Sequence, residues 1–141
     1  MLYHVVDDPA SLSPDELRER YERRIAETVE AVGVAEAAAE SGVDEETVAA
    51  LVAGESPELT LREAAELLAL SPDVRDAETV VLETRDDLLL GMTTGVVDVD
   101  TLASNIDHDL TGQEVQQALE GRTRLTLAQL AAIHRFVASR N

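Results

Sequence analysis

The chain has 141 residues, and its 29 Asp and Glu against 11 basic residues give a formal net charge of −18. All basic residues are Arg, and Cys and Trp are absent, which excludes disulfides, thiolate nucleophiles, a P-loop lysine and a Schiff base. No apolar run approaches the roughly 20 residues of a membrane span, and the first eight residues lack the pattern of a signal peptide. We therefore expect a cytoplasmic protein with no membrane contact and no cofactor.

Capped helical segments follow one another along the chain. Ser13, Pro14 and Glu16 form a capping-box signature, and apolar residues at helical spacing continue to Val32. The same signals predict further helices over residues 34–41, 44–52, 60–70, 76–92, 111–121 and 126–141, and a short helix that starts at Asp98 or Asp100 and continues to Ile106. No stretch shows sustained alternation of apolar and polar residues, so the sequence predicts an all-α fold. Ser71-Pro72-Asp73 is the best candidate for a domain boundary.

The use of Arg instead of Lys in so acidic a chain resembles the proteins of extreme halophiles. At molar salt the Debye length is about 3 Å, so repulsion between carboxylates is largely screened. In such a proteome, net charge says little about nucleic-acid binding, because most proteins are acidic. The local distribution of charge is more informative.

Two stretches of the chain resemble each other when residues 44–70 are laid over residues 111–136. The matching pairs are Asp44 and Thr111, Val48 and Val115, Gly54 and Gly121, and, after a one-residue deletion, residues 59–61 and 125–127. These positions define helix caps, helix ends and buried faces. We interpret the chain as two copies of one helical unit, over residues 1–72 and 73–141. The alternative is chance similarity between capped amphipathic helices.

A motif with close spacing lies in the first copy. Its residues are Ala37-Ala38, Gly42-Val43-Asp44, Val48, Pro57, Leu59-Thr60-Leu61 and Ala65. Ala lets two helices approach closely, Gly permits a tight turn with positive φ, and the cap fixes the start of the next helix. Over roughly residues 15–70 this pattern resembles the lambda-repressor/Cro-like helix-turn-helix family. The resemblance implies two tandem helix-turn-helix-like units packed together.

The second copy departs from this pattern, because its turn has two extra residues and lacks the expected Gly. Its third and fourth helices still fit. The whole chain also resembles a haloarchaeal family of small acidic proteins without assigned function. That second resemblance supports a halophilic source and implies no mechanism.

In the helix-turn-helix family, exposed early residues of the third helix face the major groove. The first copy has three carboxylates there, at residues 44–46, so we interpret this copy as structural. In the second copy, the candidate nucleic-acid-binding residues are Thr111, Gln113, Gln116, Gln117, Arg122 and Arg124. Gln can bond adenine bidentately, and Arg can contact phosphates.

Charge is divided unevenly along the chain. Residues 1–110 hold 27 Asp and Glu against seven Arg, whereas residues 111–141 hold two against four. This division favours DNA as a partner and a transcription-associated role for the second copy. The alternative is a degenerate helix-turn-helix scaffold whose C-terminal unit binds a protein or a second copy of the chain.

No catalytic constellation is evident, and we expect a non-enzymatic protein. Asp107-His108-Asp109 is more typical of a solvated turn than of a metal site, so no metal ligands are predicted. His134 lies beside Ile133 and Phe136, which indicates a half-buried packing residue. No G-x-S-x-G nucleophile motif and no Gly-rich phosphate loop occur.

Overall fold

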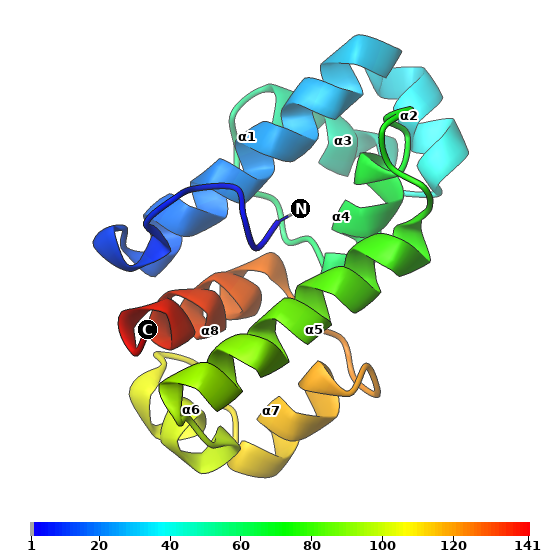
Figure 1. Cartoon of the computed structure of the whole chain (residues 1–141). Helices are drawn as coiled ribbons and strands as arrows, with labels where there is room; N and C mark the ends of the chain where they lie inside the picture. Colours follow the sequence, from blue (N-terminus) through cyan, green and yellow to red (C-terminus); the bar gives the residue numbers. More distant parts are fainter. Residues whose placement is uncertain (1) are drawn as a thin grey trace.

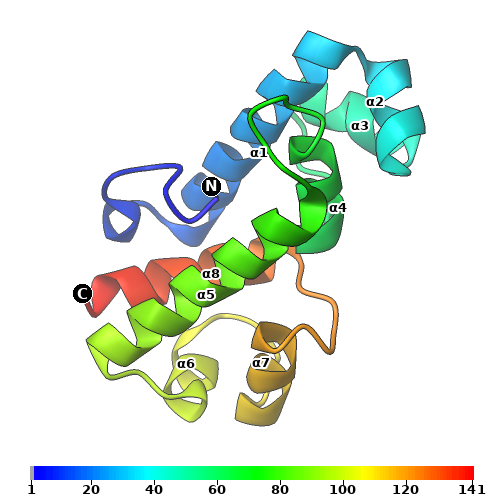
Figure 2. The ribbon, with the colours of Figure 1, turned by 45° about the vertical axis from the view of Figure 1, so that its right-hand side comes forward.

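The computed structural model describes residues 2–141, and this part of the chain contains eight α-helices, one short 3-10 helix and no strand. The prediction of an all-α fold is confirmed. The elements are η1 (Pro9–Ser11), α1 (Pro14–Val32), α2 (Val34–Ser41), α3 (Glu45–Val52), α4 (Leu61–Leu68), α5 (Ala77–Gly95), α6 (Val99–Asn105), α7 (Gly112–Leu119) and α8 (Leu127–Ser139). Their arrangement is shown in Figures 1 and 2.

Side-chain caps fix where most helices begin. Reciprocal capping boxes open the helices that follow Ser13, Thr60, Thr111 and Thr126. In each box the N-cap hydroxyl accepts from a backbone amide three residues on, and that residue's side chain accepts from the N-cap amide. Asp44 occupies the N-cap position of α3, but its side chain makes no cap hydrogen bond. The sequence therefore placed Asp44 correctly without giving its hydrogen bonding.

Helix α5 is longer than the sequence indicated, because it continues to Gly95 and not only to Met92. Gly91 does not break the helix. A Cβ atom at Gly91 would lie 2.6 Å from the Tyr3 hydroxyl and from Val137. This glycine is explained by the close approach of its neighbours rather than by helix termination.

The last helix, α8, lies between α1 and α5 (Figures 1 and 2). Helices α2 and α3 lie at one end of the molecule, and α6 and α7 lie at the other. Helix α1 packs against α8, and α4 packs against α5. We call residues 2–72 the first half and residues 73–141 the second half. Each half thus packs its first helix against the last helix of the other, and the buried side chains of both form one cluster.

Two reciprocal backbone hydrogen bonds join the halves. The Leu61 amide donates to the Leu125 carbonyl at 2.7 Å, and the Leu127 amide donates to the Leu59 carbonyl at 2.8 Å. They form an isolated antiparallel bridge between Thr60 and Thr126. These are the segments that the internal repeat aligns, so equivalent parts of the two halves contact each other directly.

The first three helices of the two halves also correspond in length, whereas the last helix is longer in the second half. They have 19, 8, 8 and 8 residues in the first half and 19, 7, 8 and 13 in the second. Gly42 closes α2 with φ at 76°, in the left-handed region that favours glycine. The interpretation of each half as a helix-turn-helix unit, and the division into units 1–72 and 73–141, stay predictions.

A buried aromatic cluster connects the N-terminal segment, α1 and α8. The Tyr21 hydroxyl is 2.5 Å from Nδ1 of His134, and the Tyr3 ring stacks on the His134 ring with centroids 4.2 Å apart. His134 is only 1% exposed, so the expectation of a half-buried residue is wrong. The N-terminal segment covers a ring that would otherwise face solvent from α8. Burial, with a smaller contribution from His4, lowers the pKa of His134 to about 4.

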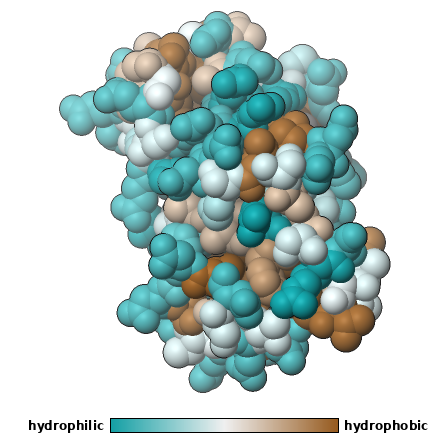
Figure 3. Space-filling model, turned by 90° about the vertical axis from the view of Figure 1, so that its left-hand side faces the viewer, coloured by the Kyte–Doolittle hydropathy of each residue, from teal (hydrophilic) through white to brown (hydrophobic). Residues whose placement is uncertain are grey.

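The surface is dominated by charged and polar residues, and Figure 3 shows one face on which apolar residues form only scattered patches. No helix among residues 2–141 combines the length and the apolarity needed to cross a bilayer.

The low pKa of His134 predicts that the protein loses stability in mild acid. The unfolded chain takes up a proton near pH 6.5, whereas folded His134 does so only near pH 4. Stability is therefore fully present above pH 6.5 and is lost as pH falls toward 4. Between pH 7 and 5 we expect a loss of about 2 kcal/mol in the free energy of unfolding. Urea unfolding in molar KCl, followed by circular dichroism, measures it.

The double variant Tyr21→Phe/His134→Leu removes the titrating ring and the hydroxyl that bonds it. We expect its stability to change much less between pH 7 and 5. The control His108→Gln should keep the wild-type pH dependence. An unchanged slope in the double variant would show that another group causes it.

The packing of α1 on α8 predicts that neither half folds well alone. Separate chains of residues 1–72 and 73–141 would each expose faces that are buried in the whole molecule. We expect weak, non-cooperative helical signal from each fragment and recovery of helicity when the two are mixed at equal concentration. Circular dichroism with thermal melting in molar KCl provides the measurement. Two fragments that each melt cooperatively would indicate independent domains.

Candidate nucleic-acid interface

Helix α7 presents one face to the core and the other to solvent. Gly112, Val115, Ala118 and Leu119 form its buried face. Of the six residues predicted from sequence, five are exposed and one, Gln117, is half-buried. The helix therefore displays the predicted residues toward solvent, because its apolar positions recur at helical spacing on the opposite side.

Two of these residues are held by one carboxylate. Nε2 of Gln116 donates to Oε1 of Glu120 at 2.9 Å, and Nε of Arg122 lies 3.1 Å from Oε2 of the same residue. The Arg122 side chain is 73% exposed, so this ion pair is weak and its partners can exchange. Glu120 thus neutralises part of the face that would meet a polyanion.

The N-terminal end of α7 is fixed by its capping box. The Thr111 hydroxyl accepts from the Glu114 amide at 3.1 Å, and Glu114 accepts from the Thr111 amide at 3.0 Å. The Thr111 hydroxyl therefore keeps its proton and one lone pair for an external partner. The Glu114 carboxylate is engaged at the helix start, where it also complements the helix dipole.

Arg124 lies apart from the other candidates, in a hollow of about 110 Å³ between the halves. Two further arginines line this hollow, Arg62 of α4 and Arg85 of α5, and no carboxylate lines it. Nε of Arg85 donates to the carbonyl of Leu119, the last residue of α7, at 2.6 Å. A cation at this end of the helix complements its dipole.

Gly121 makes room for Arg85. Its φ is 80°, and a Cβ atom there would lie 2.6 Å from a terminal nitrogen of Arg85. The sequence pattern predicted a helix end at Gly121, and no motif singled out Arg62 or Arg85. The only sequence signal for them is that these two arginines lie within an acidic stretch, since their proximity to Arg124 depends on tertiary packing.

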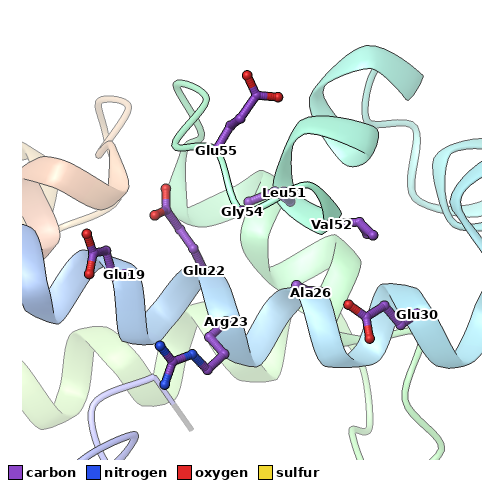
Figure 4. A pocket seen from close by; sticks show the side chains of 9 residues that line it. All are labelled: Glu19, Glu22, Arg23, Ala26, Glu30, Leu51, Val52, Gly54 and Glu55. Carbon is purple, nitrogen blue, oxygen red and sulfur yellow. The ribbon is translucent and has the colours of Figure 1, made fainter.

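The first half has an acidic hollow where α1 faces α3, with a volume of about 410 Å³. Its charged lining residues are Glu19, Glu22, Arg23, Glu30 and Glu55. Figure 4 shows Glu22 pointing from α1 toward the loop that carries Glu55, and Arg23 pointing away.

Within this hollow, burial raises the pKa of Glu22, although the Ser56 hydroxyl and Arg18 act in the opposite direction. The Ser56 hydroxyl donates to Glu22 at 2.7 Å, and Nε of Arg18 lies 3.3 Å from it. This half therefore offers carboxylates where the second half offers arginines.

A model for a family of unknown function (DUF5791) matches residues 17–140 of the chain. The chain belongs to the DUF5791 family. No curated protein and no solved structure matches it. The match begins within α1 and ends within the last two residues, so it covers both halves of this DUF5791 chain, with α7 and the arginine hollow included.

The DUF5791 chain also has surface features outside α7. Among residues 2–141, no three His, Asp or Glu side chains gather in a way that could hold a metal ion. Along α5, however, large apolar side chains are exposed. They are Leu82 at 45%, Leu89 at 45%, Leu90 at 66% and, at the end of the helix, Val96 at 91%. Helix α1 packs against α3, but α5 has no comparable packing against α7, which leaves part of its surface uncovered.

Proposed function

We propose that the chain is a non-enzymatic, DNA-binding protein with a transcription-associated role, built from two helix-turn-helix-like units. In this proposal α7 enters the major groove, and Gln113, Gln116 and Gln117 contact base edges. Thr111 contacts the backbone at the start of the helix, and Arg122 and Arg124 contact phosphates beyond its end.

The observation that carries the proposal is the polar, exposed face of α7 in the least acidic part of the chain. Gln113 and Gln117 make no side-chain hydrogen bond within residues 2–141, so their amides are available to bases. Residues 111–141 hold four Arg against two carboxylates. The equivalent face of α3 starts with Asp44 and two glutamates, which supports a structural role for the first half.

Replacing the glutamines of α7 should remove sequence-specific binding. A good bidentate contact from Gln to adenine contributes about 1–3 kcal/mol. We therefore expect Gln116→Ala/Gln117→Ala to lose discrete binding peaks in chromatin immunoprecipitation from the native host. Crosslinking inside the cell keeps the chain at its own salt concentration. The matched control is Thr93→Ala/Thr94→Ala, two exposed polar residues of α5, which should leave every peak in place.

A second variant tests the same face in the opposite direction. Glu120→Gln removes the carboxylate that holds Gln116 and Arg122. It also removes one negative charge from the surface that would face the DNA phosphates. We expect peak occupancy to rise. Absence of peaks for the wild-type chain, or peaks that persist in the double alanine variant, would overturn the assignment to α7.

The second candidate function is self-association of a degenerate helix-turn-helix scaffold through its C-terminal unit. The observation that favours it is the spacing of the exposed apolar residues on α5. Leu82 and Leu89 of α5 are seven residues apart, which is the repeat of a coiled-coil seam, and Leu90 is exposed beside Leu89. Pairing two such helices in antiparallel or parallel order would cover side chains that are now exposed to solvent.

Light scattering after size exclusion in molar KCl tests this second candidate. We expect a dimer for the wild-type chain and a monomer for Leu82→Gln/Leu89→Gln. The helical circular dichroism of the variant should be unchanged, because both side chains lie on the surface. A wild-type chain that is monomeric at high concentration would reject self-association through α5.

A further inference from the structure

We propose that the hollow between the halves, lined by Arg62, Arg85 and Arg124, is a phosphate-binding site. It shares Arg124 with the proposed DNA-binding surface, but it is separate from the base-reading glutamines of α7 and does not require them to bind DNA. The ligand chemistry is a phosphate group, from a small phosphorylated molecule or from a nucleic-acid backbone.

The two halves carry different charged residues at equivalent positions. Glu22 and Arg85 are each the ninth residue of a 19-residue helix, α1 and α5. Glu58 and Arg124 each directly precede the paired segments 59–61 and 125–127.

Glu55 and Arg122 likewise each follow a helix-ending glycine. At all three places the first half carries a carboxylate and the second half carries a guanidinium. At these three equivalent positions, the charge of the second half is therefore opposite to that of the first half.

The two halves differ in how these charged side chains are compensated. In the first half, Glu22 has Arg18 within 3.3 Å and a hydrogen bond from Ser56. In the second half, among residues 2–141, neither Arg85 nor Arg124 has a carboxylate oxygen within 4.0 Å. Arg85 is half-buried and Arg124 is exposed, so both guanidinium groups can meet an anion that enters from solvent. The protein supplies only the Leu119 carbonyl, which engages Nε of Arg85.

Guanidinium nitrogens of the arginines that line the hollow remain available as hydrogen-bond donors. Because Nε of Arg85 is engaged, its orientation is fixed, and the terminal nitrogens stay available beside Gly121. Arg62 lies at the rim, where its Nη2 bonds the exposed Glu78 at 2.8 Å. Guanidinium groups bind phosphate oxygens bidentately. Three arginines from separate segments thus converge on one hollow that no carboxylate lines.

The test is a titration with inorganic phosphate, followed by NMR on the full-length ¹⁵N-labelled chain in molar KCl. The Nε–H of Arg85 is the reporter, because its hydrogen bond to Leu119 slows exchange with water. We expect a saturable shift of this signal at millimolar phosphate. Arg124→Gln should weaken the half-saturation at least about tenfold, since it removes a charge-assisted contact. The matched control Arg20→Gln changes an exposed arginine of α1 and should leave the titration unchanged.

Arg124 is exposed, so its substitution is not expected to affect folding, and circular dichroism verifies this. The result that would overturn the proposal is an Arg85 signal that does not respond to phosphate. Equal responses of wild type and Arg124→Gln would overturn it too, and Arg85 would then only cap α7.

Duplex DNA distinguishes the two sources of phosphate. If the hollow takes a backbone phosphate, Arg62→Gln lowers affinity for all sequences by a similar factor, as measured by fluorescence anisotropy in molar KCl. If it takes a small phosphorylated molecule, this variant, whose residue lies outside the proposed DNA contacts, weakens phosphate binding but keeps its DNA affinity. The phosphate titration stands even if the chain binds no DNA, so failure of the proposed function and failure of this proposal are separate results.

Discussion

Two backbone hydrogen bonds hold the architecture together where helices α4 and α8 begin. The first-turn amides of a helix have no partner within the helix. Here the amides of Leu61 and Leu127 each find a carbonyl of the opposite half, at 2.7 and 2.8 Å. The threonines that precede them cap the same helices by reciprocal side-chain bonds. Helix initiation and contact between the halves thus depend on one pair of segments, and this pairing positions α8 between α1 and α5.

The same arrangement explains how two similar halves acquire different surfaces. The halves share their helix order and the packing of each first helix on the last helix of the other half. The ninth residue of the long helix, however, is Glu22 in one half and Arg85 in the other. Glu22 is buried among groups that compensate its charge. Arg85 instead reaches the carboxyl-terminal end of α7, where Gly121 leaves space for it. The change of charge from Glu22 to Arg85 does not disturb the fold, because neither residue belongs to the apolar cluster that both halves share.

Local signals made part of this structure predictable. Capping boxes are contained within four residues, so Ser13, Thr60, Thr111 and Thr126 could be recognised from sequence. The exposed face of α7 followed from the spacing of its apolar residues. The packing of α1 on α8 could not be derived, because it depends on contacts between residues far apart in the chain. Arg62 and Arg85 were missed for that reason, and so was the full burial of His134, which depends on Tyr3.

The net charge of −18 does not argue against an anion site on this molecule. At the molar salt chosen for the phosphate titration the Debye length is about 3 Å, so carboxylates elsewhere on the surface contribute little to the potential in the hollow. What acts there is the set of charges in direct contact, and these are three arginines and, at the rim, the Glu78 carboxylate that bonds Arg62. Because Arg85 is partly buried and oriented by Leu119, salt screens it less than an exposed side chain. In an acidic protein, the charge of the ligand that a site accepts is therefore determined by the side chains that line the site. In the second half these side chains include arginines where the first half has glutamates.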